Sequence, residues 1–196
     1  QVRAGIWYEG SSTDRHRLDL DRTLGLPNPI EKPPASGPIP AADIQFIEHS
    51  SWTQFQPFLD LELHPVAQLT LTPGVKYMHF TRNVDAPVGS KTRLVNFTSH
   101  ETFTRTLPFM SANYRITDMW STYAQFAQGF LVPPLSVFYV PTPGVHPAVK
   151  PQLSTNYQLG TVFNANQFTF DGDVYYIRFT NKFGKVGSKS DPYYTN

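Results

Sequence analysis

Apolar and polar side chains alternate along short segments of this chain, and that pattern predicts β-strands. In residues 58–64, Leu59, Leu61 and Leu63 fall on one side of an extended chain and the intervening residues on the other. A period of two is typical of a strand with one buried face. Further strands are predicted at residues 44–48, 68–72, 75–81, 93–98, 101–107, 135–140 and 174–179. Because no long segment has helical periodicity, the sequence predicts an all-β protein.

An aromatic segment in the middle of the chain lacks this alternation. Pro108 follows the strand predicted at 101–107, and a proline removes a backbone donor from the ladder, so we expect the chain to leave the sheet there. Residues 114–130 then carry Tyr114, Trp120, Tyr123 and Phe126. Structureless loops of this length are uncommon in compact domains and are usually functional. We expect this loop either to cover the end of a barrel or to be covered by another chain.

Prolines divide the chain into three predicted parts. Residues 1–42 are rich in proline and have no sustained periodicity, which predicts an extended N-terminal arm. The cluster Ile6, Trp7 and Tyr8 favours an arm that docks on neighbouring chains over a solvated tail. Residues 43–181 form the predicted β-domain, with Asp171 and Gly172 as a bulge in its last strand. Residues 182–196 form a modestly basic tail.

Composition limits the classes of function. The 196 residues include no cysteine, 16% are charged and 14% are aromatic, with 18 prolines and a net charge of +1. The low charge favours a protein that neighbours cover, and it excludes an arginine-rich arm that condenses RNA. The sequence has no run of about 18 apolar residues, the length that a membrane-spanning helix needs, so no membrane span is predicted.

Candidate chemistry is sparse. Asp60 and Glu62 are predicted to share one strand face about 7 Å apart, a spacing that some glycosidases use. A solvent-facing or interface-facing strand explains them equally well. The histidines have no metal-ligand spacing, and no nucleophile, phosphate-loop or dinucleotide motif occurs. The sequence therefore predicts no enzyme activity and no cofactor.

Several segments in the second half of the chain resemble a virus capsid protein. The order is LPFMSANYRITD, a loop containing Gly129, SVFYV, a proline-rich connection, NQFTF and a last strand near residues 174–179. Upstream, KYMHF followed by DAPVG is similar to a strand and turn of the same family. Over residues 75–181 the chain thus resembles a large capsid protein of picornaviruses and their relatives. The resemblance implies an eight-stranded jelly-roll β-sandwich with an extended proline-rich N-terminal arm.

The function that this resemblance implies is structural. The chain would pack with related jelly-roll subunits in an icosahedral shell, assemble in the host cytoplasm, enclose an RNA genome with weak direct contact, and present loops to a host receptor. Candidate contacts with other subunits are Ile6, Trp7, Tyr8, Tyr114, Arg115, Trp120, Tyr123 and Phe126. The alternative is a β-sandwich carbohydrate-binding module or glycosidase that uses exposed aromatic rings as a stacking platform.

Overall fold

A computed structural model describes residues 1–18, 44–88, 97–135, 149–165, 167–187 and 192–195. Almost all of the described residues lie in β-strands, which confirms the predicted all-β class. In these segments no helix is long and apolar enough to cross a membrane.

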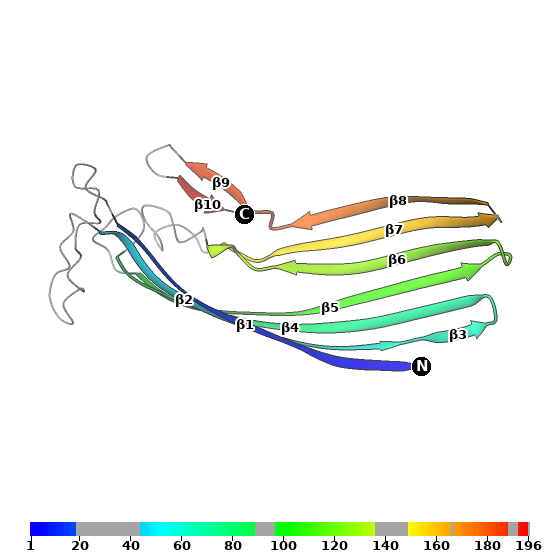
Figure 1. Cartoon of the computed structure of the whole chain (residues 1–196), viewed down its shortest axis with the longest axis horizontal. Helices are drawn as coiled ribbons and strands as arrows, with labels where there is room; N and C mark the ends of the chain where they lie inside the picture. The colour runs from blue at the N-terminus through cyan, green and yellow to red at the C-terminus, as the bar shows by residue number, and fades with distance from the viewer. Residues whose placement is uncertain (19–43, 89–96, 136–148, 166, 188–191, 196) are drawn as a thin grey trace.

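One large antiparallel sheet dominates the molecule (Figure 1). It has eight strands in the order β1-β2-β4-β5-β6-β7-β8, with the short β3 paired to β4. A separate hairpin of β9 and β10 follows. The strands are β1 Val2–Leu18, β2 Ile44–Leu61, β3 Leu63–Val66, β4 Leu69–Val88, β5 Phe97–Arg115, β6 Trp120–Leu131, β7 Gln152–Ala165, β8 Phe168–Thr180, β9 Gly184–Gly187 and β10 Pro192–Thr195.

The two ends of the sheet differ in how the chain connects its strands. At the right end in Figure 1, residues 67–68 and 116–119 join consecutive strands by short turns, and the facing ends of β7 and β8, at Ala165 and Phe168, lie at the same end. The strand ends that border residues 19–43, 89–96 and 132–151 lie at the opposite end. We call these the short-turn end and the long-connection end.

The strands differ in length, so the sheet is uneven at the long-connection end. Pairing between β5 and β6 stops at Phe109 and Ala127, whereas β4 and β5 continue in register as far as Ala86 and Phe97. Strands β1, β2, β4 and β5 thus extend beyond β6, and we call this part the extension. Pro108 lies one residue beyond the last β5–β6 pair, where sheets tolerate proline because the strand has a neighbour on only one side.

The small buried core lies in the extension. Met78, Phe80 and Leu107 are buried together, and the ring of Phe80 stacks on that of Trp52 with centroids 5.7 Å apart. Offset stacking of this kind adds to the stabilisation from burying the rings. Most other large apolar side chains of the described residues are exposed, so the core does not explain most of the apolar sequence.

The predicted jelly roll is wrong. A jelly roll packs two sheets face to face, whereas the large strands described here form one sheet whose neighbours follow each other almost in chain order. Residues 2–18 of the expected arm form β1, which pairs with β2 along its whole length. Residues 19–42 and most of the predicted strand at 135–140 lie outside the described residues.

The aromatic loop expected at 114–130 is also different in the structure. Strand β5 continues through Pro108 to Arg115, and Trp120–Leu131 forms β6. Asp171 and Gly172 pair with Val162 and Thr161 inside β8 without a register shift. The domain boundaries at 42 and 181 otherwise remain predictions.

Candidate functional site

One face of the sheet is apolar over its middle, and we call it the apolar face. The register places Ala112, Ala124, Leu159 and Val174 in one row across β5, β6, β7 and β8. Leu159 is 56% exposed and Val174 is 68% exposed. Contiguous exposed apolar surface on a soluble protein normally marks an interaction site. This face therefore requires an apolar environment outside the chain.

Aromatic rings lie in two rows on the apolar face. Trp120, Phe163 and Phe170 form one row beside the short-turn end, and the indole Nε1 of Trp120 donates to Thr161 Oγ1 at 2.7 Å. A second row is nearer the long-connection end, where the ring centroid of Tyr157 is 5.4 Å from that of Phe126 and 6.4 Å from that of Tyr176. The rows are six residues apart on β6, about 20 Å along the strand.

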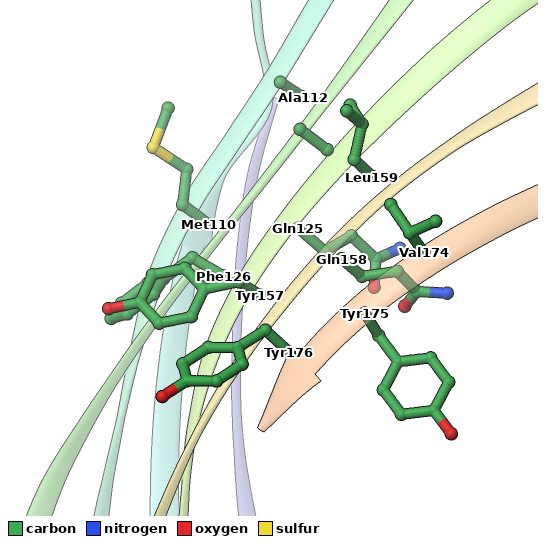
Figure 2. A pocket seen from close by; sticks show the side chains of 11 residues that line it. Met110, Ala112, Gln125, Phe126, Tyr157, Gln158, Leu159, Val174, Tyr175 and Tyr176 are labelled. Atoms are coloured by element: carbon green, nitrogen blue, oxygen red, sulfur yellow. The ribbon is translucent and has the colours of Figure 1, made fainter. Parts of the chain in front are cut away.

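A groove of about 570 Å³ lies between the larger side chains of this region. Figure 2 shows Phe126, Tyr157 and Tyr176 turned to the same side, with Tyr175 turned away from them. The groove is lined by Met110, Ala112, Ala124, Gln125, Phe126, Tyr157, Gln158, Leu159, Val174, Tyr175 and Tyr176. No charged side chain is among them, so the groove can accept an apolar group but offers no ion-pair partner.

The opposite face, which we call the polar face, carries hydrogen-bonding and charged side chains. In β7 and β8 the amide nitrogen of Gln158 donates to Asp173 Oδ2 at 2.6 Å. Near the start of β1 the guanidinium of Arg3 pairs with Asp60 at 2.8 Å. The alternation of apolar and polar residues along each strand thus separates two chemically different faces.

Three aromatic rings on the polar face lie directly over glycines of a neighbouring strand. A Cβ added at Gly160 would lie 2.3 Å from the ring of Tyr123, and one at Gly74 would lie 2.2 Å from that of Phe109. Phe58 covers Gly5 in the same way. Rings over strand glycines replace the packing that a side chain would supply, and only glycine leaves room for them here.

We therefore expect Gly160→Ala to destabilise the folded protein by about 1–3 kcal/mol, because the methyl group forces the ring of Tyr123 off its site. Gly10→Ala is the matched control, since the nearest atom to its added Cβ is 3.4 Å away. Urea unfolding of the two variants measures the difference. Equal unfolding midpoints for the two variants would contradict the proposed packing.

Charged pairs are also present in the extension. Arg15 Nη2 lies 3.0 Å from Glu48 Oε1, and the Glu48 residue is 3% exposed. Burial raises the pKa of the Glu48 carboxyl above its usual value, and the charge and hydrogen bond of Arg15 partly oppose that shift. Arg82 makes a second buried pair with Glu101. Both pairs lie on the polar face, whereas a third pair, His49 with Asp14 at 2.6 Å, lies on the other face of the extension.

The residues predicted as contacts are distributed over both faces. Ile6, Tyr8, Tyr114, Trp120 and Phe126 lie on the apolar face, whereas Trp7, Arg115 and Tyr123 lie on the polar face. No interaction in the structure tests whether they touch another chain. Prediction missed the rows around Tyr157 and Leu159, although the apolar positions 153, 157, 159 and 163 carried a period-two signal.

The chemistry considered from sequence does not assemble. Asp60 lies in β2 and binds Arg3, whereas Glu62 lies between β2 and β3, 3.5 Å from the His64 ring. No group of three or more His, Cys, Asp or Glu side chains among the described residues could hold a metal ion. The site is therefore the pair of faces rather than a catalytic cluster.

An antiparallel sheet with an apolar, aromatic-bordered face and a polar face is typical of the wall of a membrane-type β-barrel. A family model described as "TonB dependent receptor-like, beta-barrel" matches residues 3–196. The chain belongs to this family. Its members are receptors and transporters, and the chain is not an enzyme.

Solved structures share this fold. The ferric yersiniabactin uptake receptor FyuA from Yersinia pestis has a TM-score of 0.64 and 17% identity, over 93% of this chain and 26% of that one. The ferric-catecholate import receptor Fiu from E. coli K12 has a TM-score of 0.68 and 13% identity, over 99% of this chain and 30% of that one. The chain thus spans less than a third of either receptor. No curated protein sequence is similar enough to count as a match.

These findings overturn the capsid interpretation. Family membership replaces the picornavirus resemblance, and with it the viral shell, the capsid and RNA partners, the host receptor and the virion location. They give no support to a carbohydrate-binding module or glycosidase. The low charge and the aromatic content fit an apolar surface that something covers. A second protein chain is not the only apolar environment that could cover it. The lack of a long apolar run concerns helices only, because a strand crosses a bilayer with about 10 alternating residues.

Proposed function

We propose that this chain forms part of the barrel wall of a bacterial outer-membrane receptor that imports a ferric chelate with energy delivered through TonB. The observation that carries the proposal is the separation of the two faces between the aromatic rows. Barrels of this class have an apolar outer band about 25 Å tall, with aromatic girdles at both borders and a polar interior. The apolar face then contacts lipid, and the polar face lines the lumen.

The different ends of the sheet give the wall an orientation. Outer-membrane barrels have short turns on the periplasmic side and longer loops outside the cell. The short-turn end, which holds the turn at residues 116–119, is accordingly periplasmic, and the long-connection end is extracellular. The extension then stands above the outer aromatic row, on the side from which a ligand arrives.

The ligand class rests on the family and on charge. The names of FyuA and Fiu state that those receptors take up ferric chelates. On the polar face of this chain Lys76 and Arg105 are exposed, and Lys76 Nζ lies 5.5 Å from the centre of the Phe109 ring. Exposed cations beside aromatic rings suit an anionic ligand with aromatic groups, such as a ferric catecholate.

The test is uptake by the complete protein that contains this chain. We expect cells that lack their own ferric-catecholate receptors to accumulate ⁵⁵Fe from ferric enterobactin when they express it, and to lose that uptake when TonB is deleted. A ferric hydroxamate serves as the comparison ligand. Outer-membrane insertion without uptake of either chelate would reject the ligand class, and absence from the outer membrane would reject the whole proposal.

A further inference from the structure

The extension has an apolar patch on the face that turns toward the lumen under the proposed function. Phe80 and Phe103 pair across β4 and β5, and Met78 and Leu107 share their face. Met78, Phe80 and Leu107 are at most 8% exposed. An apolar patch above the membrane gains nothing from facing water, so something in the protein must cover it.

The cover is the segment in which β6 ends, residues 130–135, which we call the crossing segment. Phe130 and Val132 pack against the Met78, Phe80 and Leu107 cluster. Pro133 is less than 2% exposed, the most complete burial of a large side chain among the described residues. Beyond Ala127 strand β6 no longer pairs with β5 and is held only by β7, as far as Leu131, so the chain can bend across β4 and β5.

Arg82 joins the crossing segment to the wall. Its Nη1 donates to the Pro133 carbonyl oxygen at 2.5 Å, and its Nη2 donates to Glu101 Oε2 at 2.5 Å. The Arg82 side chain is 3% exposed, while that of Glu101 is 28% exposed. A buried guanidinium is tolerated only when paired and hydrogen-bonded. Its planar fork also holds two acceptors at a fixed separation, which the compact ammonium of lysine does not reproduce.

We propose that Arg82 is a positioning residue for the entrance of the receptor: it holds the crossing segment against the lumen side of β4 and β5, so that an entering ferric chelate meets this segment instead of the bare strands. This inference rests on the proposed function. Arg82 lies on the lumen-facing side of β4 but is buried at 3% exposure, so it acts through Pro133 on the shape of the entrance and does not contact the ligand itself.

The first measurement follows the crossing segment directly and needs no ligand. Nitroxide labels at Thr13→Cys and Pro134→Cys in the complete protein report the distance from β1 to the segment. The 196 residues contain no cysteine, so within this chain the labels are unique. We expect a narrow distance distribution for the parent protein, a broad one for Arg82→Met, and an intermediate one for Arg82→Lys. The matched control is Arg17→Met, since Arg17 is an exposed arginine of the extension, on β1.

The second measurement uses ⁵⁵Fe-loaded enterobactin. We expect Arg82→Met to raise the half-saturating concentration for uptake about tenfold, a binding loss of about 1.4 kcal/mol, while maximal uptake stays within twofold. Phe130→Ala loosens the crossing segment without removing a charge. It should therefore broaden the distance distribution and raise the half-saturating concentration, as Arg82→Met does. Agreement between the two variants would show that the effect of Arg82→Met is not a simple folding defect.

The outcomes separate the two proposals. A distance distribution that stays narrow in Arg82→Met, or a half-saturating concentration that does not change, overturns the role of Arg82. If the parent protein shows the narrow distance but takes up no chelate, the proposed function fails and the entrance role fails with it, while anchoring by Arg82 is judged by the distances alone. Equal effects of Arg17→Met and Arg82→Met would show a general response to loss of charge and would overturn the role of Arg82.

Discussion

Replacing Leu159 with Arg is expected to prevent stable insertion of the protein into a bilayer. Leu159 lies between the aromatic rows of the apolar face and is 56% exposed. Under the proposed function this side chain contacts the hydrocarbon core, where an Arg on the lipid face of a barrel costs about 2–4 kcal/mol near the midplane. A single substitution should therefore lower the equilibrium constant for insertion by at least tenfold.

Gln158→Arg is the matched control for this experiment. Gln158 is the preceding residue of β7, and its side chain bonds Asp173 on the polar face. An Arg at position 158 faces the lumen beside a carboxylate, so insertion should be unchanged within about 0.5 kcal/mol. Folding into vesicles, followed by the electrophoretic shift of the unheated barrel, measures the inserted fraction. Equal insertion of the two variants would show that the apolar face does not meet lipid.

Phe80→Ala is expected to cost about 3–5 kcal/mol in the local stability of the extension, because it leaves a cavity in a well-packed cluster. Phe80 stacks on Trp52 and belongs to the cluster that the crossing segment covers. The aromatic rows of the apolar face do not contact this cluster, so the loss of stability should stay in the extension. Amide hydrogen exchange in β4 and β5 measures the opening free energy residue by residue.

The control for the cluster is Thr104→Ala, an exposed position adjacent to Phe103 on β5. It should change exchange by less than about 0.5 kcal/mol. Faster exchange that spreads through β7 and β8 in Phe80→Ala would mean that the extension and the barrel wall unfold as one unit, in conflict with a separate core.

Alternation identified the β class and several strands correctly. Leu59 and Leu61 predicted a strand with one apolar face, and both lie on the apolar face of β2. The same rule could not recover β6, because Thr122, Ala124 and Gln128 dilute the apolar positions between Trp120 and Phe130. Strands that face lipid on one side give a weak signal individually, and their meaning emerges only from the register of several neighbours.

The site was harder to predict than the fold class because the apolar environment that its apolar face requires lies outside the chain. Exposed aromatic residues and low charge fit both a protein interface and a lipid interface, and the capsid interpretation chose the first. The position of Arg82 beside Pro133 depends on where β6 leaves β5, which follows from long-range pairing. No local pattern around residue 82 contains that information.

The strict two-residue period of β7 also determines which sequence changes this protein tolerates during evolution. Deleting a single residue near Tyr157 would turn every later position of the strand to the other side, so that Asn156 and Gln158 would exchange environments with Tyr157 and Leu159. Amide groups would then enter the apolar band while the aromatic and leucine side chains faced water. Insertions and deletions within such strands should therefore be tolerated when they involve two residues and not when they involve one.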